Sequence, residues 1–396
     1  MSRLIVKNFG PLKDVDIELN RINLFIGENG SGKSVLAKLI TVIFDLSSTD
    51  EKKIFKSFNE YNISYITNNS IIEYYEDKLL FSLKEKKIFF SKERKEVTSE
   101  LKNLEKEKKS LYSAIKNLKN IMPYEELEKK ILENEIVEEY GSQYILNILK
   151  EVKEDSKYSH EFISQYIPAE RNLISLFNKS LTTLLVAEVP LPKFLLQFSS
   201  DFEKAGNELK ELEFLNVKYV NGDGLDRHKV YFNDKDYLPL EFSSSGIQSA
   251  LPLYLTVKYF ANRHHSIIIE EPEQNLFPKA QAETIKYIIE QVSNDNSLFM
   301  MTHSPYVLST LNNLIMAYKV AQMSTETKEQ VKELIKEEQW INPSEFSAYY
   351  LEDGIAKNIV SKRGLISDNK IDDISEEITG EFDDLMQIYR EFKYAK

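Results

Sequence analysis

The sequence predicts an α/β protein, in which an antiparallel β subdomain joins a parallel α/β core and a helical segment is inserted between them. A mostly apolar run at 22–26 leads into G-E-N-G-S-G-K-S, and apolar residues then recur at helical spacing. Two further apolar runs, 266–270 and 297–301, flank a helical pattern at 278–293. This strand-helix-strand order is typical of a parallel sheet covered by helices.

The first 90 residues predict the antiparallel subdomain together with the strand at 22–26. Short alternating runs bounded by turn residues lie at 3–9, 14–19, 71–75, 79–83 and 87–90. The polar stretch 47–60 predicts a loop. We assign 1–90 as the N-terminal lobe.

A heptad pattern follows and predicts a long helix. Its positions repeat at 4-3-4-3 spacing, and seven of the eight are apolar: Val97, Leu101, Leu104, Lys108, Leu111, Ile115, Leu118 and Met122. At 1.5 Å per residue the helix would be about 40 Å long, and Pro123 would end it. We interpret 91–150 as an inserted helical hairpin or coiled coil. An ordinary two-helix subdomain without a projecting arm is the alternative.

The rest of the chain predicts a second lobe and an extension. Residues 151–320 contain a second β meander at 214–241, an apolar helix at 251–260, and the buried strands named above. Residues 321–396 predict a C-terminal α+β extension with an acidic helical end.

Composition limits the classes of protein and of partner. The chain has 396 residues, no cysteine and a net charge of −12. The absence of cysteine excludes disulfides and thiolate metal sites. No signal peptide and no apolar run of about 20 residues is present, so the sequence predicts a cytoplasmic protein that does not enter a membrane. The acidic charge does not favour DNA as a direct partner.

The segment 27–34 has the phosphate-loop pattern G-x-x-x-x-G-K-S. Glycines let the backbone curl so that its N–H groups face phosphate oxygens, and the following helix adds its positive end. Lys33 would contact the β- and γ-phosphates, and the Ser34 hydroxyl would bind Mg²⁺. The expected nucleotide-binding residues are Gly27, Asn29, Gly30, Ser31, Gly32, Lys33, Ser34 and Val35. The alternative is a glycine-rich turn before an unrelated helix.

Polar residues at the ends of two other predicted strands would complete this site. Glu270 would hold Mg²⁺ through water, and Glu271 would orient or deprotonate the attacking water. His303, in T-H-S-P, would report hydrolysis at the γ-phosphate. We therefore expect Lys33, Glu271 and His303 to be catalytic, with Ser34 and Glu270 as the metal site. Two exposed acids at a strand-to-helix turn, and a structural histidine, are the alternatives.

The segment 242–248, F-S-S-S-G-I-Q, joins a strand to the helix at 251–260. Ser245, Gly246 and the start of the helix would form a second anion-binding surface. By composition alone this segment is a helix cap.

Together these motifs resemble those of ATP-binding-cassette ATPases, in the soluble branch that includes the SMC, RecF and SbcC proteins. Y-I-P-A-E-R at 166–171 and E-E-P-E-Q-N-L-F-P at 270–278 are similar to the AAA-15/OLD-like group found in bacterial anti-phage defence systems. The chain departs from the common pattern at Glu270, where many members have Asp. It also departs at Ser244 and Ile247 in the signature loop, which leaves the hydrolysis rate open. Gln165 and Arg171 are candidates for the Q-loop position.

The resemblance implies that ATP and Mg²⁺ are sandwiched between two subunits. Ser245, Gly246 and Gln248 of one subunit would then face the phosphate loop of the other. Residues 273–275 would form the D-loop across the interface. The expected assembly is a homodimer or higher homo-oligomer formed through the ATPase heads.

OLD nucleases carry a Toprim domain after the ATPase, and the stretch beyond His303 is too short for one. We therefore expect a slow ATPase that acts as sensor or scaffold in a defence complex, with a separate effector such as a nuclease or toxin. A RecF- or SMC-like ATPase that binds DNA directly in repair or chromosome maintenance is the alternative. A third hypothesis is an ATP-gated structural assembly in which hydrolysis is incidental.

Overall fold

A computed structural model describes most of the chain outside the predicted insertion. The described residues are 2–45, 49–96, 98–99, 103, 106, 164–177, 186–222, 227–261, 266–292, 296–367 and 370–394. The chain divides into two compact units, one of Met1–Phe44, Asp50–Phe89 and Ser164–Lys396, the other of Asp45–Thr49 and Phe90–Ile163. Most of the heptad pattern and of the hairpin predicted at 91–150 lies outside the described residues.

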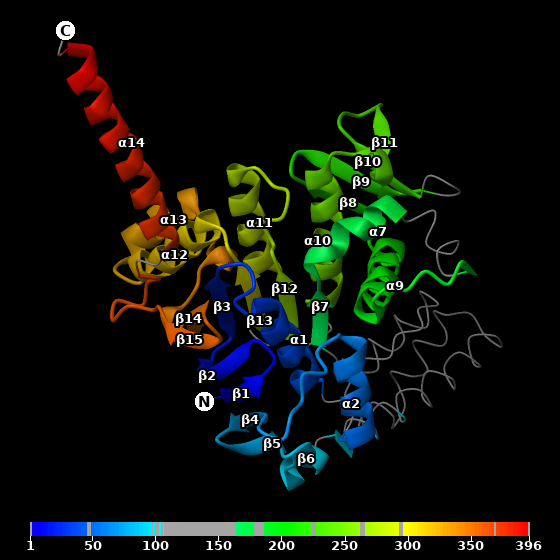
Figure 1. Cartoon of the computed structure of the whole chain (residues 1–396). Coiled ribbons are helices and arrows are strands. Elements are labelled where there is room, and N and C mark those ends of the chain that lie inside the picture. The colour runs from blue at the N-terminus through cyan, green and yellow to red at the C-terminus, as the bar shows by residue number, and fades with distance from the viewer. Residues whose placement is uncertain are drawn as a thin grey trace. The chain divides into compact units, whose positions relative to one another are not determined.

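Eleven of the described strands form a large mixed sheet (Figure 1). Its order is β6-β5-β4-β1-β2-β15-β14-β3-β13-β12-β7. The bounds are β1 Ser2–Phe9, β2 Leu12–Leu19, β3 Ile22–Gly27, β4 Ile71–Glu76, β5 Lys78–Lys84, β6 Lys87–Phe90, β7 Ser164–Ile167, β12 Ser266–Glu270, β13 Ser297–Thr302, β14 Phe346–Glu352 and β15 Ile355–Asn358.

One side of this sheet is antiparallel. β1 pairs with β2 and β4, and β4 pairs with β5. Val15, Ile17 and Leu19 of β2 are buried while the residues between them are exposed. This is the period-two pattern of a strand with one face on the core. The strands predicted in the N-terminal lobe are thus confirmed, each within a few residues.

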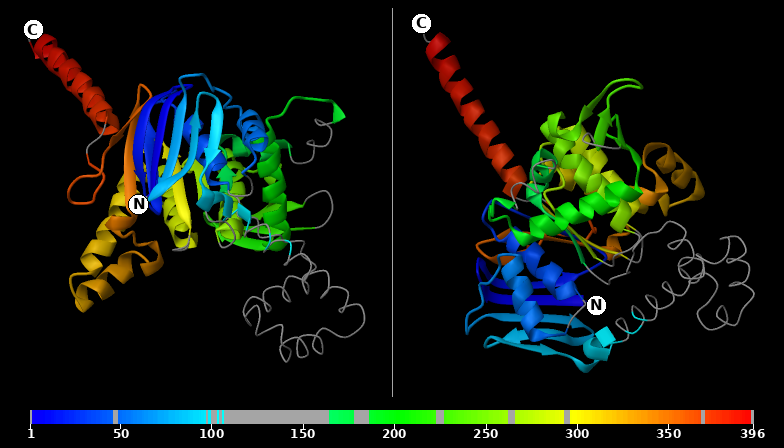
Figure 2. Two further views of the ribbon diagram at one scale, coloured as in Figure 1. Left: turned by 90° about the horizontal axis from the view of Figure 1, so that it is seen from below. Right: turned by 90° about the vertical axis from the view of Figure 1, so that its right-hand side faces the viewer.

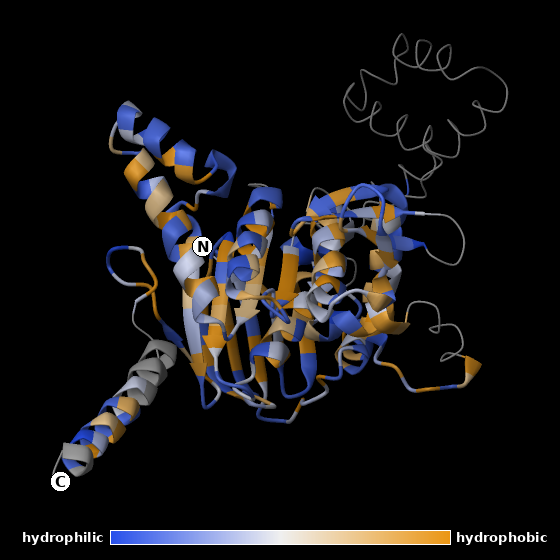
Figure 3. Ribbon diagram, turned by 90° about the horizontal axis from the view of Figure 1, so that it is seen from above, coloured by the Kyte–Doolittle hydropathy of each residue, from blue (hydrophilic) through white to orange (hydrophobic). Residues whose placement is uncertain are grey.

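The other side is parallel and more deeply buried. β3, β12, β13 and β7 run in one direction, and every residue of β3 and β12 is buried. Strands covered by helices on both faces have such continuous apolar sequences, and Figure 3 shows the hydrophobic colour along the central strands. The predicted α/β class, with an antiparallel part and a parallel core, is confirmed.

The described helices are α1 Lys33–Phe44, α2 Glu51–Glu60, α7 Asn172–Phe177, α9 Lys193–Glu208, α10 Ser245–Phe260, α11 Pro278–Gln291, α12 Pro305–Ala321, α13 Thr325–Leu334 and α14 Lys370–Tyr394. Short 3-10 turns lie at η1 Ala169–Arg171, η2 Leu240–Phe242, η3 Glu337–Gln339 and η4 Pro343–Glu345. α1 packs on β7, β12 and β13, and α10 packs on α7, α9 and α11. No helix among the described residues is long and apolar enough to cross a membrane.

A second described sheet has the order β11-β10-β9-β8. Its strands are β8 Glu211–Phe214, β9 Val217–Asn221, β10 His228–Tyr231 and β11 Tyr237–Pro239, and they pair antiparallel in chain order. They confirm the meander predicted at 214–241. β8 packs on α10, and in the right-hand view of Figure 2 this sheet lies at the top, beside the green helices.

The structure differs from the sequence prediction at β14 and β15, which were assigned to a C-terminal extension. β14 lies inside the large sheet, parallel to β3, and β15 connects it to β2. All residues of β14 except Glu352 are buried. The run F-S-A-Y-Y-L-E predicts a strand. Its neighbour β15 follows it directly, but its other neighbour, β3, lies more than 300 residues earlier, and local pattern carries no information about that pairing.

The prediction of a loop at 47–60 was wrong, because residues 51–60 form α2. Asp50 caps the helix by accepting a hydrogen bond from the Lys52 amide, which satisfies one of the free N–H groups of the first turn. Ile54 and Phe58 are one helical turn apart and buried, and Phe58 contacts the ring of Phe9 at 5.9 Å. Two apolar residues at this spacing are enough to dock a short, otherwise polar helix.

Candidate functional site

The candidate site lies at the carboxyl ends of three adjacent parallel strands. β13 pairs with β3 on one side and with β12 on the other, and each of the three strands ends in a motif predicted from sequence. Parallel strands bring their carboxyl ends to one edge of the sheet, where open α/β sheets bind ligands. The topology therefore brings together the phosphate loop, the Glu270–Glu271 pair and His303.

The phosphate loop joins β3 to the start of α1 and depends on its glycines. Gly30 and Gly32 have φ of +80° and +101°, in the left-handed region that favours glycine. A Cβ on Gly27 would lie 2.3 Å from the Leu351 carbonyl oxygen of β14. The Ser31 Oγ atom is buried inside the loop with no hydrogen-bond partner. An unpaired polar atom in a glycine cradle fits a loop built to receive phosphate oxygens.

Lys33 is buried, with 8% of its surface exposed. Its Nζ atom donates to the carbonyl oxygens of Gly27 at 2.6 Å and Glu28 at 2.9 Å. Burial lowers the pKa of Lys33, while the negative charges of Glu271 and Glu273 act to raise it. The ammonium group is thus held within its own loop, where it can exchange carbonyl partners for the oxygens of a phosphate.

Glu270 lies at the end of β12 and is 4% exposed. The Tyr166 hydroxyl donates to its Oε1 atom, and the Ser34 hydroxyl is a second hydrogen-bond partner. Burial raises the pKa of Glu270, and both hydroxyls oppose that rise. A carboxylate beside a hydroxyl at the start of α1 fits Mg²⁺, which usually takes one or two protein carboxylates and completes its shell with phosphate and water. Among the described residues no cluster of three or more metal-binding side chains occurs.

Glu271 follows directly and has an unusual backbone conformation. Its φ is +45°, which is rare for a residue other than glycine and is often seen at functional sites. Its N–H donates to the Met301 carbonyl at 2.8 Å, and its Oε1 atom lies 3.7 Å from Nδ1 of His303. Both side chains are partly exposed, so water can reach the carboxylate and the imidazole.

Sequence reasoning placed Glu273 in the D-loop and missed its contacts with the strand end at His303. Glu273 is 4% exposed, and its Oε1 atom accepts hydrogen bonds from Thr302 Oγ1 at 2.7 Å and from the His303 amide at 3.1 Å. The same oxygen lies 3.7 Å from His303 Nδ1. Three carboxylates within four residues were the available signal. Glu273 fixes the main chain from which His303 projects.

The signature segment lies at the start of α10, and its three predicted residues have surroundings that differ from one another. Ser245 is exposed. Gly246 packs so closely on the turn after β12 that a Cβ would lie 2.9 Å from the Asn275 carbonyl oxygen. Gln248 is buried, and its Nε2 atom donates to the Glu241 carbonyl at 2.9 Å. Ser245 and Gly246 thus lie at the start of the helix, while the Gln248 side chain turns back into its own loop.

A hollow of about 360 Å³ adjoins the phosphate loop. Asn29, Gly30 and Ser31 line one side, and residues 350–354 of the β14–β15 turn line another. The structure brings Asn29 to this hollow, and places Val35, half-buried, in the first turn of α1. The C-terminal strands therefore form part of the wall around the candidate nucleotide site.

The two Q-loop candidates have different surroundings. The Gln165 amide on β7 lies 3.4 Å from an Asp201 carboxylate oxygen of α9. Arg171 is fully buried and donates to main-chain carbonyls, among them those of Glu270 and Glu271. Of the two, Arg171 is in direct contact with the carboxylate motif.

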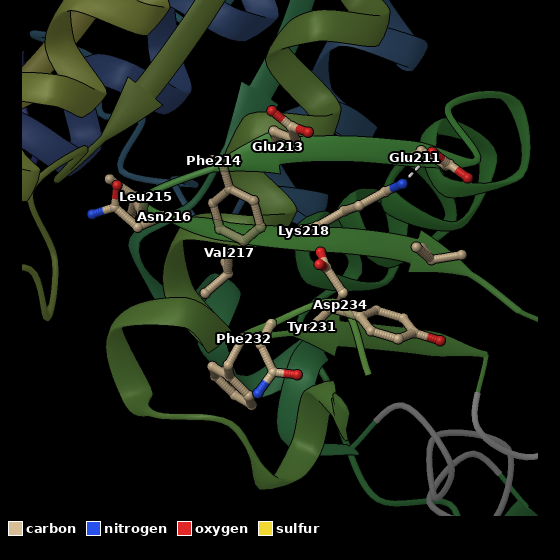
Figure 4. Close-up of a pocket in the computed structure, with 12 residues that line it drawn as sticks. Glu211, Glu213, Phe214, Leu215, Asn216, Val217, Lys218, Tyr231, Phe232 and Asp234 are labelled. Carbon is tan, nitrogen blue, oxygen red and sulfur yellow. Dashed lines mark ion pairs between the residues drawn. The ribbon is translucent and has the colours of Figure 1, made fainter. Parts of the chain in front are cut away.

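A separate hollow of about 810 Å³ lies on the four-stranded sheet (Figure 4). Residues of β8, β9 and β10 line it, and the Lys218–Glu211 ion pair spans 2.7 Å beside it. Its lining contains none of the predicted nucleotide-site residues.

Comparison with known families agrees with these motifs. The model of the AAA_15 family, described as an AAA ATPase domain, matches residues 1–203 and 173–308. The chain belongs to the AAA_15 family. This AAA_15 match includes the phosphate loop, both carboxylates, the signature segment and His303. No curated protein sequence matches the chain.

The AAA_15 chain is also similar to solved SMC head domains, with low identity. It is 13% identical to the Smc head domain of Pyrococcus furiosus with an extended coiled coil, bound to the C-terminal domain of ScpA. The alignment covers 96% of this chain and 100% of that one, with a TM-score of 0.36. It is 10% identical to the SMC head domain of Thermotoga maritima, covering 90% of this chain and 97% of that one, also with a TM-score of 0.36.

Proposed function

We propose that this AAA_15 protein binds and slowly hydrolyses ATP, and that two subunits sandwich the nucleotide between their heads. The observation that carries the proposal is the convergence of three motifs at one sheet edge. Lys33 and Ser34 follow β3, Glu270 ends β12 and Glu271 comes directly after it, and His303 follows β13. These are the groups that phosphoryl transfer requires, namely a phosphate cradle, a metal ligand and a residue that positions water.

Each side chain has a role that follows from its surroundings. Lys33 exchanges the carbonyls of Gly27 and Glu28 for the oxygens of the bound nucleotide. Ser34 and Glu270 would hold Mg²⁺, which neutralises charge on the β- and γ-phosphates when bound. Glu271 is partly open to water and would orient or deprotonate the attacking water.

His303 lies beside both Glu271 and Glu273. It would detect the change in charge when the γ-phosphate leaves. Because Glu273 accepts a hydrogen bond from the His303 amide, the main chain is held there, and the imidazole ring is the part of His303 that would respond.

The sandwich is supported by the outward position of the signature segment. Ser245 is exposed at the start of a helix of 16 residues, whose first turn offers free N–H groups to an anion. The phosphate loop already has its own helix, so a second anion-binding helix on the same chain is best used by the nucleotide of a second subunit.

We further propose that the chain is the sensor or scaffold subunit of an anti-phage defence complex in the cytoplasm, with a nuclease or toxin as a separate effector. This part rests on the AAA-15/OLD-like motifs 166–171 and 270–278. The net charge of −12 does not favour the alternative in which the chain clamps DNA directly.

The test combines a hydrolysis variant with a binding variant. We expect Glu271→Gln to lower kcat about 100-fold or more, to retain ATP, and to double its solution mass when ATP and Mg²⁺ are added. Lys33→Ala is the matched control, and it should neither bind ATP nor change mass. A Glu271→Gln protein whose mass ignores ATP would exclude the nucleotide-dependent sandwich, and wild-type protein that binds no ATP would exclude the function as a whole.

A further inference from the structure

We infer that Arg171 is a positioning residue that connects Glu271 to the first turns of α10. In one subunit, Glu271 and the start of α10, which would serve two different ATP molecules, would then move together. This inference rests on the proposed sandwich. Glu271 would serve the ATP bound to its own phosphate loop, whereas Ser245 and Gly246 of the same chain would serve the ATP of the partner.

The first support is the burial and bonding of the guanidinium. Arg171 has no exposed surface. Its Nε atom donates to the Ser249 carbonyl at 3.1 Å, Nη1 to the Pro168 and Glu270 carbonyls at 3.1 and 2.8 Å, and Nη2 to the Glu271 carbonyl at 2.6 Å. These bonds all end on main-chain oxygens, in three segments of the chain. A buried charge that makes such bonds orients backbone.

Arg171 keeps its charge at neutral pH. Burial lowers its pKa to about 10, and the negative charges of Glu273, Glu271 and Glu270 act in the opposite direction. The guanidinium therefore remains an ionised donor that attracts the carboxyl groups of the candidate site as well as bonding to their main chain.

The second support is the backbone of Glu271. Its left-handed φ of +45° is unfavourable for a residue with a Cβ and persists only where the surroundings hold it. Three bonds hold this residue: its N–H donates to the Met301 carbonyl, and its own carbonyl accepts from the Gln274 amide and from Arg171. Without the Arg171 bond only the Gln274 amide would hold this carbonyl, and we expect the backbone to relax enough to shift the carboxylate from its position 3.7 Å from His303.

The third support is on the side of α10. Nε of Arg171 bonds to the Ser249 carbonyl, and the hydroxyl of the same serine donates to Gln274 Oε1 at 3.1 Å. Gly246 packs on the Asn275 carbonyl. The start of α10 is thus connected to the turn after β12 at several points, and the Arg171 side chain bonds both α10 and the Glu271 carbonyl directly.

Lysine cannot replace this connection. Its ammonium is a single point on a flexible stem, whereas the planar guanidinium presents donors on several sides at fixed angles. Arg171→Lys therefore keeps the charge and much of the volume but loses the simultaneous contact with α10 and with the two glutamate carbonyls.

The experiment measures ATP binding, kcat and KM for wild type and for Arg171→Lys, with Arg227→Lys as the matched control. Arg227 pairs with Glu203 away from the candidate site. We expect Arg171→Lys to bind ATP within about threefold of wild type but to lose at least about tenfold in kcat, and Arg227→Lys to behave like wild type. Equal kcat in all three proteins would overturn the inference.

A second measurement does not depend on turnover. In a Ser245→Arg background, where the added side chain blocks the partner's nucleotide, we compare amide hydrogen exchange at 245–250 with and without ATP. We expect ATP to change exchange there when Arg171 is present and not in Arg171→Lys. Exchange at 245–250 that ignores ATP while exchange at 27–35 responds would overturn the inference, even if Arg171→Lys does not fold. Lack of any ATP effect at 27–35 would instead refute the proposed function.

Discussion

Replacing Gly27 by alanine tests the contact between the phosphate loop and β14. The new Cβ would lie 2.3 Å from the Leu351 carbonyl oxygen and 2.9 Å from Ser31 Oγ. Ser31 can rotate away, but the carbonyl belongs to a strand paired with β3 on this very residue, so either the loop or the end of β14 must shift. Overpacking of this kind lowers the free energy of unfolding by about 1–3 kcal/mol. Because the neighbour here is backbone, which cannot rotate away, we expect Gly27→Ala to cost about 3 kcal/mol.

Two other glycines provide matched controls for the same change. Gly30 has nothing within 4 Å of its added Cβ and differs only in its φ of +80°, so Gly30→Ala should cost about 1–2 kcal/mol from backbone strain alone. Gly380 lies in open space within α14, where Gly380→Ala should stabilise by about 0.5–1 kcal/mol.

The assay is urea unfolding followed through Trp340, the single tryptophan of the chain, together with binding of a fluorescent ATP analogue. We expect Gly27→Ala to be the least stable of the three variants and to weaken nucleotide binding about tenfold or more, because the loop is displaced. A Gly27→Ala protein no less stable than Gly30→Ala would refute the argument from close approach.

Three further predictions use the same unfolding measurement. Burial raises the pKa of Asp201 above its ordinary 3.8. Between 3.8 and the raised value the folded state keeps a proton that the unfolded chain releases, so the free energy of unfolding falls as pH rises through this window. Asp201→Asn should remove that fall. Each pH unit in this window is worth about 1.4 kcal/mol, and identical pH profiles would contradict it. Tyr349→Phe should lower the free energy of unfolding by about 1–3 kcal/mol, because the hydroxyl accepts from the N–H of Glu18 and donates to its carbonyl, both at 2.8 Å. Tyr65→Phe, on an exposed ring, is the control, and a smaller loss of stability in Tyr349→Phe than in Tyr65→Phe would contradict this prediction. Phe58→Ala should cost about 3–5 kcal/mol by undocking α2, and Phe55→Ala nearby should cost less.

The sequence predicted that the motifs of the candidate site lie near one another because each motif is local. Each consists of a buried strand followed at once by polar residues, and the strand-helix-strand order at 266–301 brings two of the strand ends to one edge. The identity of each side chain then limits the chemistry it can do. Glu270, Glu271 and His303 could be predicted as neighbours without knowing any contact.

Contacts between distant segments could not be predicted in the same way. Arg171 lies in a recognisable motif, but its carbonyl partners belong to peptides that only the folded sheet brings close. The sequence of β14 predicts a strand, yet nothing in F-S-A-Y-Y-L-E indicates that it pairs with β3 in addition to its neighbour in sequence, β15. α2 was missed for a different reason, since a ten-residue polar helix has a weak intrinsic tendency to form and depends on docking Ile54 and Phe58.

The place of β14 beside β3 has a consequence for how this protein is made. Arg21 and Glu345, which form an ion pair where these two strands begin, are 324 residues apart in the chain. At synthesis rates of about 5–20 residues per second, about 15–65 seconds pass between their appearance. During that interval the phosphate-loop strand has an open edge, and such edges pair readily with other strands. The nascent chain therefore holds an unfinished candidate site until β14 is made, and a nucleotide bound there would stabilise the protein only after that strand has paired with β3.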